Sequence, residues 1–307
     1  MTKSQPSKGA KGLRRSLHFV PGGNDRMFEK ALALPADSLI LDLEDSVIPE
    51  NKEAAREHVC HWINETDFGT QECLVRINPQ DTPWGRDDLA AIMEVLPDGL
   101  VLPKVASRAD VDVIDEMMTP VEQAHDVEAG SISLLLIGTE VPEAVFNLPE
   151  MTKNARVDAI TWGAEDLSGA LGAKAKRDEQ GNYLEVFSYV RSTCLLSAVA
   201  GGAQPIDAVY VDIKNTAGLV RESKMAADMG YTGKITIHPT QIEIVNDAFT
   251  PSDAEISEAA ELIQAFQEQQ AAGKMAFSFK GQMVDVPHLT RARKIMAIAA
   301  HISALAS

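Results

Sequence analysis

The sequence of 307 residues is poor in cysteine and histidine. Its three cysteines, Cys60, Cys73 and Cys194, lie far apart, so they form neither a zinc knuckle nor a disulfide framework. The seven histidines do not cluster as zinc ligands usually do. We therefore expect free thiols, no zinc and a cytoplasmic location.

Basic residues are also scarce. Lysine and arginine number 28 against 45 aspartates and glutamates, which gives a formal net charge of −17. Such a charge repels a phosphate backbone, so we expect no nucleic-acid partner. An anionic ligand would have to be bound by basic residues gathered locally around its site.

Long hydrophobic runs are absent. No apolar stretch approaches the roughly 20 residues that cross a bilayer, and we expect no membrane partner. The hydrophobic content of 45% and charged content of 24% are typical of a globular protein. Residues 1–12 are polar and basic, without the apolar core of a secretory signal, and are predicted to form a flexible tail.

Short apolar segments rich in β-formers recur through residues 13–250. Stretches with helical periodicity separate them, and eight such strand-then-helix units favour a closed parallel barrel over an open sheet. We predict an α/β fold of the (β/α)₈ TIM-barrel type. The predicted strands are residues 16–20, 39–43, 73–77, 100–103, 133–137, 159–162, 208–211 and 235–237.

Residues 251–307 exceed what a barrel needs. They contain a long predicted helix over 252–272, a segment over 276–287 with a turn signal at Lys280 and Gly281, and a last helix over 288–305. This C-terminal helical extension could cap the barrel mouth or form an arm that packs on a neighbouring subunit. We favour the arm.

Charged residues gather where the predicted strands end, which is where TIM-barrel enzymes carry their catalytic groups. Arg76 lies at the end of the third strand, and its fork of donors can bind a substrate carboxylate or a developing enolate oxygen. The acids at these strand ends are Asp42, Glu44, Asp45, Glu140, Glu165 and Asp166.

Glu140 and Asp166 have the character of a metal pair. Two carboxylates from neighbouring strand ends suit Mg²⁺, which prefers few protein ligands and keeps open positions for water and substrate oxygens. Each acid alone could instead cap a helix or pair with a lysine. Together with Glu44 and Asp45 they would repel one another unless a cation or Arg76 compensates them, and a divalent ion resolves that repulsion.

Ordered segments covering nearly the whole chain resemble the citrate lyase β-subunit-like family of CoA-ester lyases, within the HpcH/HpaI aldolase superfamily. That family includes malyl-CoA and citramalyl-CoA lyases. The matching segments are Arg15-Ser16, Pro21-Gly22, residues 42–45, Lys52, Ala55-Arg56, residues 75–78, Leu102-Pro103-Lys104, Glu140 with Asn147, residues 163–167, Gly233-Lys234, residues 237–239, Gln241 and residues 281–285.

The resemblance implies a carbon–carbon lyase that cleaves or condenses a β-hydroxyacyl-CoA, such as malyl-, methylmalyl- or citramalyl-CoA. The products of cleavage would be an acyl-CoA and a 2-keto acid. It implies that Glu140 and Asp166 ligate Mg²⁺, with Mn²⁺ as an alternative ion, and that Arg76 faces the reacting carbonyl. Glu44 and Asp45 would order metal-bound waters.

Further roles are implied by the same resemblance. Backbone amides around Ala164, Glu165 and Asp166 would hold the keto-acid carboxylate, and Arg15 and Lys30 would contact the phosphates of coenzyme A. Asp285 would reach the active site of an adjacent subunit and exchange a proton with the reacting carbon. We therefore expect a homotrimer or homohexamer.

Two departures from the family pattern leave alternatives open. Glu140 follows Gly138-Thr139, where many members have Ile-Glu-Thr, and the turn after the first strand adds Asp25 near the proposed phosphate path. The alternatives are a malyl-CoA thioesterase, a CoA-free class II pyruvate aldolase, and a carrier-dependent citrate lyase β subunit. Lys104 invites a Schiff-base mechanism and His238 a general base. For both we favour structural roles.

Overall fold

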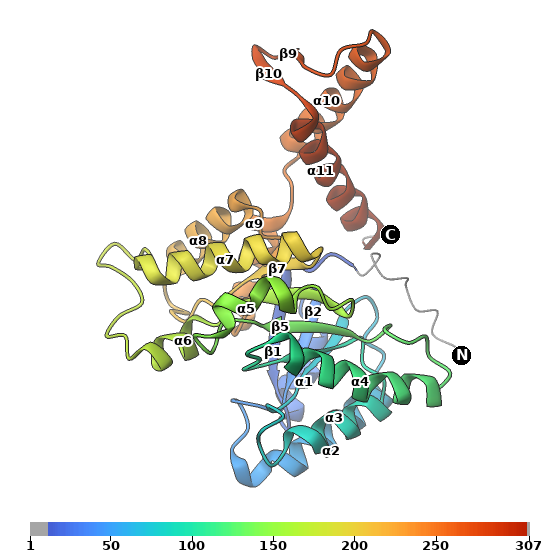
Figure 1. The fold of residues 1–307 in the computed structure, drawn as a ribbon, viewed down its shortest axis with the longest axis vertical. Helices are drawn as coiled ribbons and strands as arrows, with labels where there is room; N and C mark the ends of the chain where they lie inside the picture. Colours follow the sequence, from blue (N-terminus) through green and yellow to red (C-terminus); the bar gives the residue numbers. More distant parts are fainter. Residues whose placement is uncertain (1–11, 306–307) are drawn as a thin grey trace. The chain divides into compact units, whose positions relative to one another are not determined.

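The computed structural model describes residues 12–305 and contains a closed barrel of eight parallel strands in sequence order (Figure 1). The predicted TIM-barrel fold is confirmed. The predicted tail lies outside the described residues, apart from Gly12. The strands are β1 (Ser16–Pro21), β2 (Ser38–Asp42), β3 (Glu72–Arg76), β4 (Gly99–Leu102), β5 (Ser133–Ile137), β6 (Val157–Thr161), β7 (Gln204–Asp207) and β8 (Gly233–Thr236).

Helices follow the strands and lie outside the barrel. The helices up to residue 249 are α1 (Asp25–Leu32), α2 (Lys52–Glu65), α3 (Gly85–Glu94), α4 (Arg108–Ala124), α5 (Ala144–Met151), α6 (Ala164–Leu171), α7 (Glu185–Gly201), α8 (Thr216–Met229) and α9 (Ile242–Phe249). Two short 3₁₀ turns, η1 (Pro49–Asn51) and η2 (Pro239–Gln241), precede α2 and α9.

The barrel interior is a packed apolar core to which every strand contributes. Its residues are Leu17, Ile40, Leu74, Val101, Leu135, Ile137, Ala159, Ile206 and Ile235, with Phe19 and Val209 packed against them. Because alternate residues of a strand share a face, the side chain two positions after a core residue also points inward. This rule places Asp42, Arg76 and Thr161 inside the barrel at the carboxyl ends of β2, β3 and β6.

A buried arginine closes the opposite end of the barrel. Arg14 precedes β1 and is 1% exposed, and its Nη2 lies 2.6 Å from Glu72 Oε1 and 2.9 Å from Asp158 Oδ2. Glu72 also accepts a hydrogen bond from Ser38 Oγ. Because these partners compensate the guanidinium, it can fill the amino-terminal end without an unpaired buried charge.

The seventh strand differs from its prediction. The apolar run at 208–211 was predicted to form it, but β7 is Gln204–Asp207 and ends where that run begins. β7 is short, pairing with β8 only through Ile206 opposite Gly233 and Asp207 opposite Lys234. The apolar run instead begins at the carboxyl end of the barrel, where Ala208 and Val209 line a cavity.

A second compact unit begins at Asp247, within α9, whereas the sequence predicted a boundary after residue 250. It contains α10 (Asp253–Ala271), the hairpin β9 (Phe277–Phe279) and β10 (Gln282–Val284), and α11 (Val286–Leu305). Lys280 and Gly281 form the hairpin turn with φ values of 48° and 82°, as a two-residue turn between strands requires. Within residues 12–305, no helix is both long and apolar enough to cross a membrane.

Candidate active site

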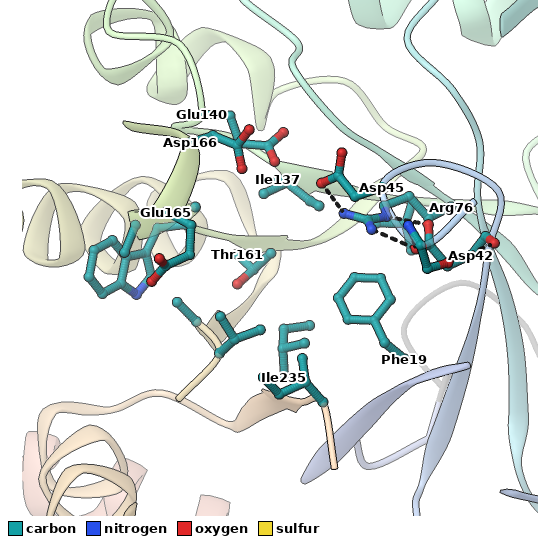
Figure 2. Close-up of a pocket in the computed structure, with 18 of the residues that line it drawn as sticks. Phe19, Asp42, Asp45, Arg76, Ile137, Glu140, Thr161, Glu165, Asp166 and Ile235 are labelled. Atoms are coloured by element: carbon teal, nitrogen blue, oxygen red, sulfur yellow. Dashed lines mark hydrogen bonds and ion pairs between the residues drawn. The ribbon is translucent and has the colours of Figure 1, made fainter. Parts of the chain in front are cut away.

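A cavity of about 400 Å³ opens at the carboxyl ends of the barrel strands. Its floor is apolar and includes Phe19, Val101, Ile137 and Ile235. Thr161 adds one hydroxyl group that has no hydrogen-bond partner within residues 12–305. Figure 2 shows Glu140 and Asp166 on one side of this cavity and Arg76 with Asp42 on the other.

Arg76 is held rigidly in the cavity wall. It pairs in register with Asp42 across β2 and β3, and its Nε and Nη2 donate hydrogen bonds to the two oxygens of Asp42 at 2.6 and 2.7 Å. The guanidinium also lies 4.4 Å from the ring centre of Phe19. Burial alone would lower the pKa of Arg76, but the hydrogen bonds and charge of Asp42 raise it, so this cation is permanent.

Two predicted acids that follow β2 lie next to Arg76 and differ in their burial. Glu44 is buried, with Oε2 3.0 Å from Arg76 Nη1, while Asp45 is exposed, with Oδ2 3.5 Å from the same nitrogen. Burial raises the pKa of Glu44, and the charge of Arg76 opposes that rise. Asp45 lines the cavity, whereas Glu44 is not part of the lining and pairs with Arg76 and Lys104.

Glu140 lies deep in the cavity wall and is 4% exposed. Its Oε2 accepts a hydrogen bond from the backbone N–H of Lys104 at 2.6 Å. Burial raises the pKa of Glu140 to about 8. Gly163 packs directly against it, because a Cβ at that position would lie 2.6 Å from Glu140 Cγ. Thr139 fixes this contact by accepting a hydrogen bond from Gly163 N at 2.9 Å.

The first turn of α6 supplies the rest of this wall. Ala164, Glu165 and Asp166 all line the cavity, and Gly163 is the N-cap of the helix. The first amides of a helix have no partner within it, so they form a natural binding site for an anionic group. The carboxylate of Glu165, in the same turn, forms an ion pair with Lys176.

A divalent ion would find two protein carboxylates here rather than a complete cage. Within residues 12–305, no three acidic, histidine or cysteine side chains converge as a metal cluster. Glu140 and Asp166 line one cavity from neighbouring strand ends. This donor set fits Mg²⁺, which commonly takes one or two carboxylates and completes its shell with water and substrate oxygens.

Three predicted site residues lie elsewhere. Arg15 precedes β1 at the amino-terminal end of the barrel, where its guanidinium pairs with Asp37 at 2.8 Å, so its position argues against the predicted contact with a ligand in the cavity. Lys30 is exposed on α1, outside the cavity lining. Asp285 belongs to the second compact unit, where His288 Nδ1 lies 2.7 Å from its Oδ1.

His238, considered as a general base, and Lys104, considered as a Schiff-base lysine, both contact nearby side chains. His238 begins the 3₁₀ turn η2, and its ring nitrogen lies 2.8 Å from Thr240 Oγ1. Lys104 forms an ion pair with Glu44. Both contacts agree with the structural roles that we favour for these residues.

Two features of the site were not predicted from the sequence: the pairing of Asp42 with Arg76, and the position of Thr161 in the cavity. The alternation of side chains along a strand could have predicted that both residues face the interior. Asp42 and Thr161 stand two residues after the core residues Ile40 and Ala159, so both had to face the interior at the carboxyl end.

Residues 15–239 match the family model of the HpcH/HpaI aldolase/citrate lyases, and the chain belongs to that family. It is 35% identical over 301 residues to the mitochondrial citramalyl-CoA lyase of Mus musculus, covering 94% of this chain and 87% of that protein. A (3S)-malyl-CoA thioesterase of Cereibacter sphaeroides is 33% identical over 290 residues, covering 94% of this chain and 96% of that protein.

A solved structure is similar over nearly the whole chain. It is the CitE protein of Mycobacterium tuberculosis in complex with magnesium, acetoacetate and coenzyme A, which is 33% identical, with a TM-score of 0.77, and covers 95% of this chain and 99% of that one. The predicted family and fold are therefore confirmed, and with them the class of enzyme, a lyase.

Proposed function

We propose that this protein is a Mg²⁺-dependent lyase that cleaves a β-hydroxyacyl-CoA, such as malyl-, methylmalyl- or citramalyl-CoA, into an acyl-CoA and a 2-keto acid. One observation carries the proposal: a single cavity joins a carboxylate pair, Glu140 and Asp166, to a permanently charged arginine, Arg76, above an apolar floor. The relatives named for citramalyl-CoA and malyl-CoA support the substrate class.

Glu140 and Asp166 would hold the Mg²⁺ ion, which when bound would polarise the keto-acid carbonyl as a Lewis acid. Arg76 would place its fixed charge where the oxyanion develops, and it needs no rearrangement because Asp42 already orients it. The free amides of the first turn of α6 would bind the keto-acid carboxylate. Asp45 would orient water molecules at the rim of the cavity, and Glu44 behind it.

Cleavage begins when a base removes the proton of the β-hydroxyl group. The electron pair of the O–H bond forms the carbonyl of the keto acid, the carbon–carbon bond breaks, and its electrons remain as the enolate of the thioester. A proton delivered to the enolate carbon completes the acyl-CoA. We propose that Asp285 of a neighbouring subunit delivers it, in a homotrimer or homohexamer.

The phosphates of coenzyme A need cations at the cavity mouth. Met27 of α1 lines the cavity, and Lys30 lies one turn further along the same exposed helix. Arg26 is exposed one turn before Lys30. We retain Lys30 for the phosphates and propose Arg26 in place of Arg15, because Arg15 lies at the other end of the barrel.

A thioesterase is the second candidate, because a relative with that name is 33% identical to this chain. In that reaction water attacks the thioester carbonyl, and the products are the free hydroxy acid and coenzyme A. The CoA-free aldolase would not need Lys30, and the carrier-dependent subunit would need an acyl-carrier protein. We further propose a cytoplasmic location, consistent with three free cysteines.

The decisive experiment incubates the purified protein and Mg²⁺ with malyl-, methylmalyl-, citramalyl- and citryl-CoA and identifies the products by mass spectrometry. We expect a keto acid and a shortened acyl-CoA, abolished by EDTA and by Glu140→Ala. Glu143→Ala is the matched control, because Glu143 is an exposed acid three residues along the chain and outside the cavity lining. Free hydroxy acid with coenzyme A would make the thioesterase the function, and no turnover would reject both.

A further inference from the structure

Lys104 contacts four of the acids that the sequence placed at the strand ends: Glu44, Asp45, Glu140 and Asp166. Its Nζ forms an ion pair with Glu44 and lies 3.9 Å from Asp45 Oδ1 and 3.6 Å from Asp166 Oδ1. Its backbone N–H donates to Glu140 Oε2 at 2.6 Å. One residue therefore joins the acids that follow β2 to those that follow β5 and β6.

The backbone of Lys104 is strained to make these contacts. Its φ of 54° lies in the left-handed region, which disfavours residues with a Cβ. Lys104 follows Pro103 directly after β4, and the left-handed turn directs its N–H to Glu140 while its side chain reaches Glu44. Strain of this kind persists where surrounding contacts hold it, and it is common at functional sites.

Both cations of the site contact Glu44 and Asp45, but they differ in their other partners. Arg76 pairs with Asp42, Glu44 and Asp45, all of which follow or end β2. The ammonium group of Lys104 also lies 3.6 Å from Asp166 Oδ1, and its charge opposes the rise in the pKa of Glu140. The sequence suggested that a divalent ion relieves the repulsion among these acids. Lys104, beside the two proposed metal ligands, already reduces that repulsion.

We propose that Lys104 is a positioning residue that acts as the built-in counter-ion of this acid set, holding it assembled without metal and weakening its affinity for divalent ions. The inference rests on the proposed function, because it takes Glu140 and Asp166 as the metal ligands. A positive charge within 3.6 Å of one ligand repels an incoming Mg²⁺. The same charge keeps the carboxylates in place when the ion is absent.

The test measures Mg²⁺ affinity by isothermal titration calorimetry in the full-length protein. Lys104→Met removes the ammonium group and keeps most of the side-chain stem. We expect its Kd for Mg²⁺ to fall about tenfold, because the repulsion is lost, and the metal-free variant to melt at a lower temperature than the wild type. A residue that merely supports the fold would give the opposite sign, a weaker affinity for Mg²⁺.

Two further variants complete the test. Lys104→Gly also removes the charge but relieves the left-handed strain, so it remains informative if Lys104→Met does not fold, and it should show the same tighter binding. Lys153→Met is the matched control, because Lys153 forms a lysine–glutamate pair with Glu150 outside the cavity lining. Its Mg²⁺ affinity should equal that of the wild type.

An unchanged or weaker Mg²⁺ affinity in both Lys104 variants would overturn the inference. Failure of the proposed function looks different, because the wild-type protein itself would then bind no Mg²⁺ or show no product that depends on it. Measuring the wild type first in the same titration separates the two results.

Discussion

Arg76 faces the barrel interior because side chains alternate along β3, and its partner Asp42 fixes the orientation of its guanidinium group. Two fork nitrogens bind both oxygens of Asp42, a geometry that lysine cannot reproduce. We expect Arg76→Lys to lower kcat by about 100-fold, through loss of the oriented donor at the oxyanion, and to lower the free energy of unfolding by about 2 kcal/mol. Steady-state kinetics and urea unfolding measure the two effects.

Arg108→Lys is the control for that substitution. Arg108 pairs with Asp112 one turn away on the surface of α4, so the change should leave both kcat and stability near those of the wild type. Turnover within a few fold of wild type in Arg76→Lys would show that position 76 needs only a charge.

His18 gives the barrel a specific sensitivity to acid. It lies in β1 opposite Thr236 of β8, is 4% exposed, and has its Nδ1 3.0 Å from Thr236 Oγ1. Burial and the nearby His238 together lower the pKa of His18 to about 4, although the hydrogen bond with Thr236 opposes this shift. Below pH 6.5 the unfolded chain binds a proton at this position that the folded protein does not, so stability falls until the pH reaches about 4.

We expect this histidine to account for about 3 kcal/mol of the loss in unfolding free energy between pH 6.5 and pH 4. His18→Asn, which keeps a polar partner for Thr236 and does not titrate, should lose correspondingly less over that range in urea unfolding. His125→Asn, at an exposed position, should follow the wild type. Parallel curves for wild type and His18→Asn would mean that acid sensitivity arises elsewhere.

The sequence indicated the position of the acids at the strand ends, because a position after an apolar strand is a local pattern. Glu44, Asp45, Glu140 and Asp166 follow recognisable strands, and the end of a parallel strand fixes the end of the barrel. Arg15 was misjudged although it too adjoins a strand, because it precedes β1 and does not follow it. The contacts of Lys104 depend on its left-handed φ and on residues after β2, after β5 and in the first turn of α6, and a local sequence pattern cannot predict such long-range contacts.

At the scale of elements, the barrel repeats were easier to recognise than the pieces nearest the site. α5 contains Pro149 and α6 contains Gly169, and both residues weaken the helical pattern in the sequence. Proline likewise marks β7, where Pro205 stands inside a four-residue strand. Tertiary packing against the barrel determines these elements.

Gly163, the N-cap of α6, packs against the proposed metal ligand Glu140. Its φ of −107° is open to other residues, so the need for glycine is steric: a Cβ would lie 2.6 Å from Glu140 Cγ. We expect Gly163→Ala to displace Glu140 and to weaken Mg²⁺ binding and turnover by at least about tenfold, since metal sites tolerate small displacements poorly. Calorimetry and product assays measure the two effects.

Gly169→Ala provides the control within the same helix. A Cβ at Gly169 would meet no neighbouring heavy atom within 4 Å, and alanine should stabilise α6 by about 0.5–1 kcal/mol. If Gly163→Ala behaved like Gly169→Ala, the packing of Gly163 against Glu140 would have no functional role.

At the scale of the whole molecule, the chain divides into a barrel unit and a smaller helical unit with its own core. The smaller core includes Leu262, Phe266, Val284 and Leu289. Asp285 lies in this unit between β10 and α11, half-exposed beside His288. The cavity acids and Arg76 all lie in the barrel unit. The proposed proton donor and the proposed metal ligands thus belong to different compact units.

This division makes subunit mixing a direct test of the proposed assembly. Glu140→Ala removes a proposed metal ligand and Asp285→Asn removes the proposed proton donor, so each homo-oligomer should be nearly inactive. If Asp285 acts in a neighbouring subunit, random co-assembly in equal amounts restores both groups at about a quarter of all sites, and at about a third of the sites in mixed trimers, so activity in the mixed oligomers should return to about a quarter to a third of wild type.

Co-expression of the two variants with different affinity tags, followed by purification through both tags, supplies the mixed oligomers. The same preparation of each single variant is the control, and light scattering reports the size of the assembly. A donor that acts within its own chain would leave every subunit of the mixed oligomer with one lesion, and no activity would return. Recovery of activity would place the smaller unit of one chain at the active site of the next.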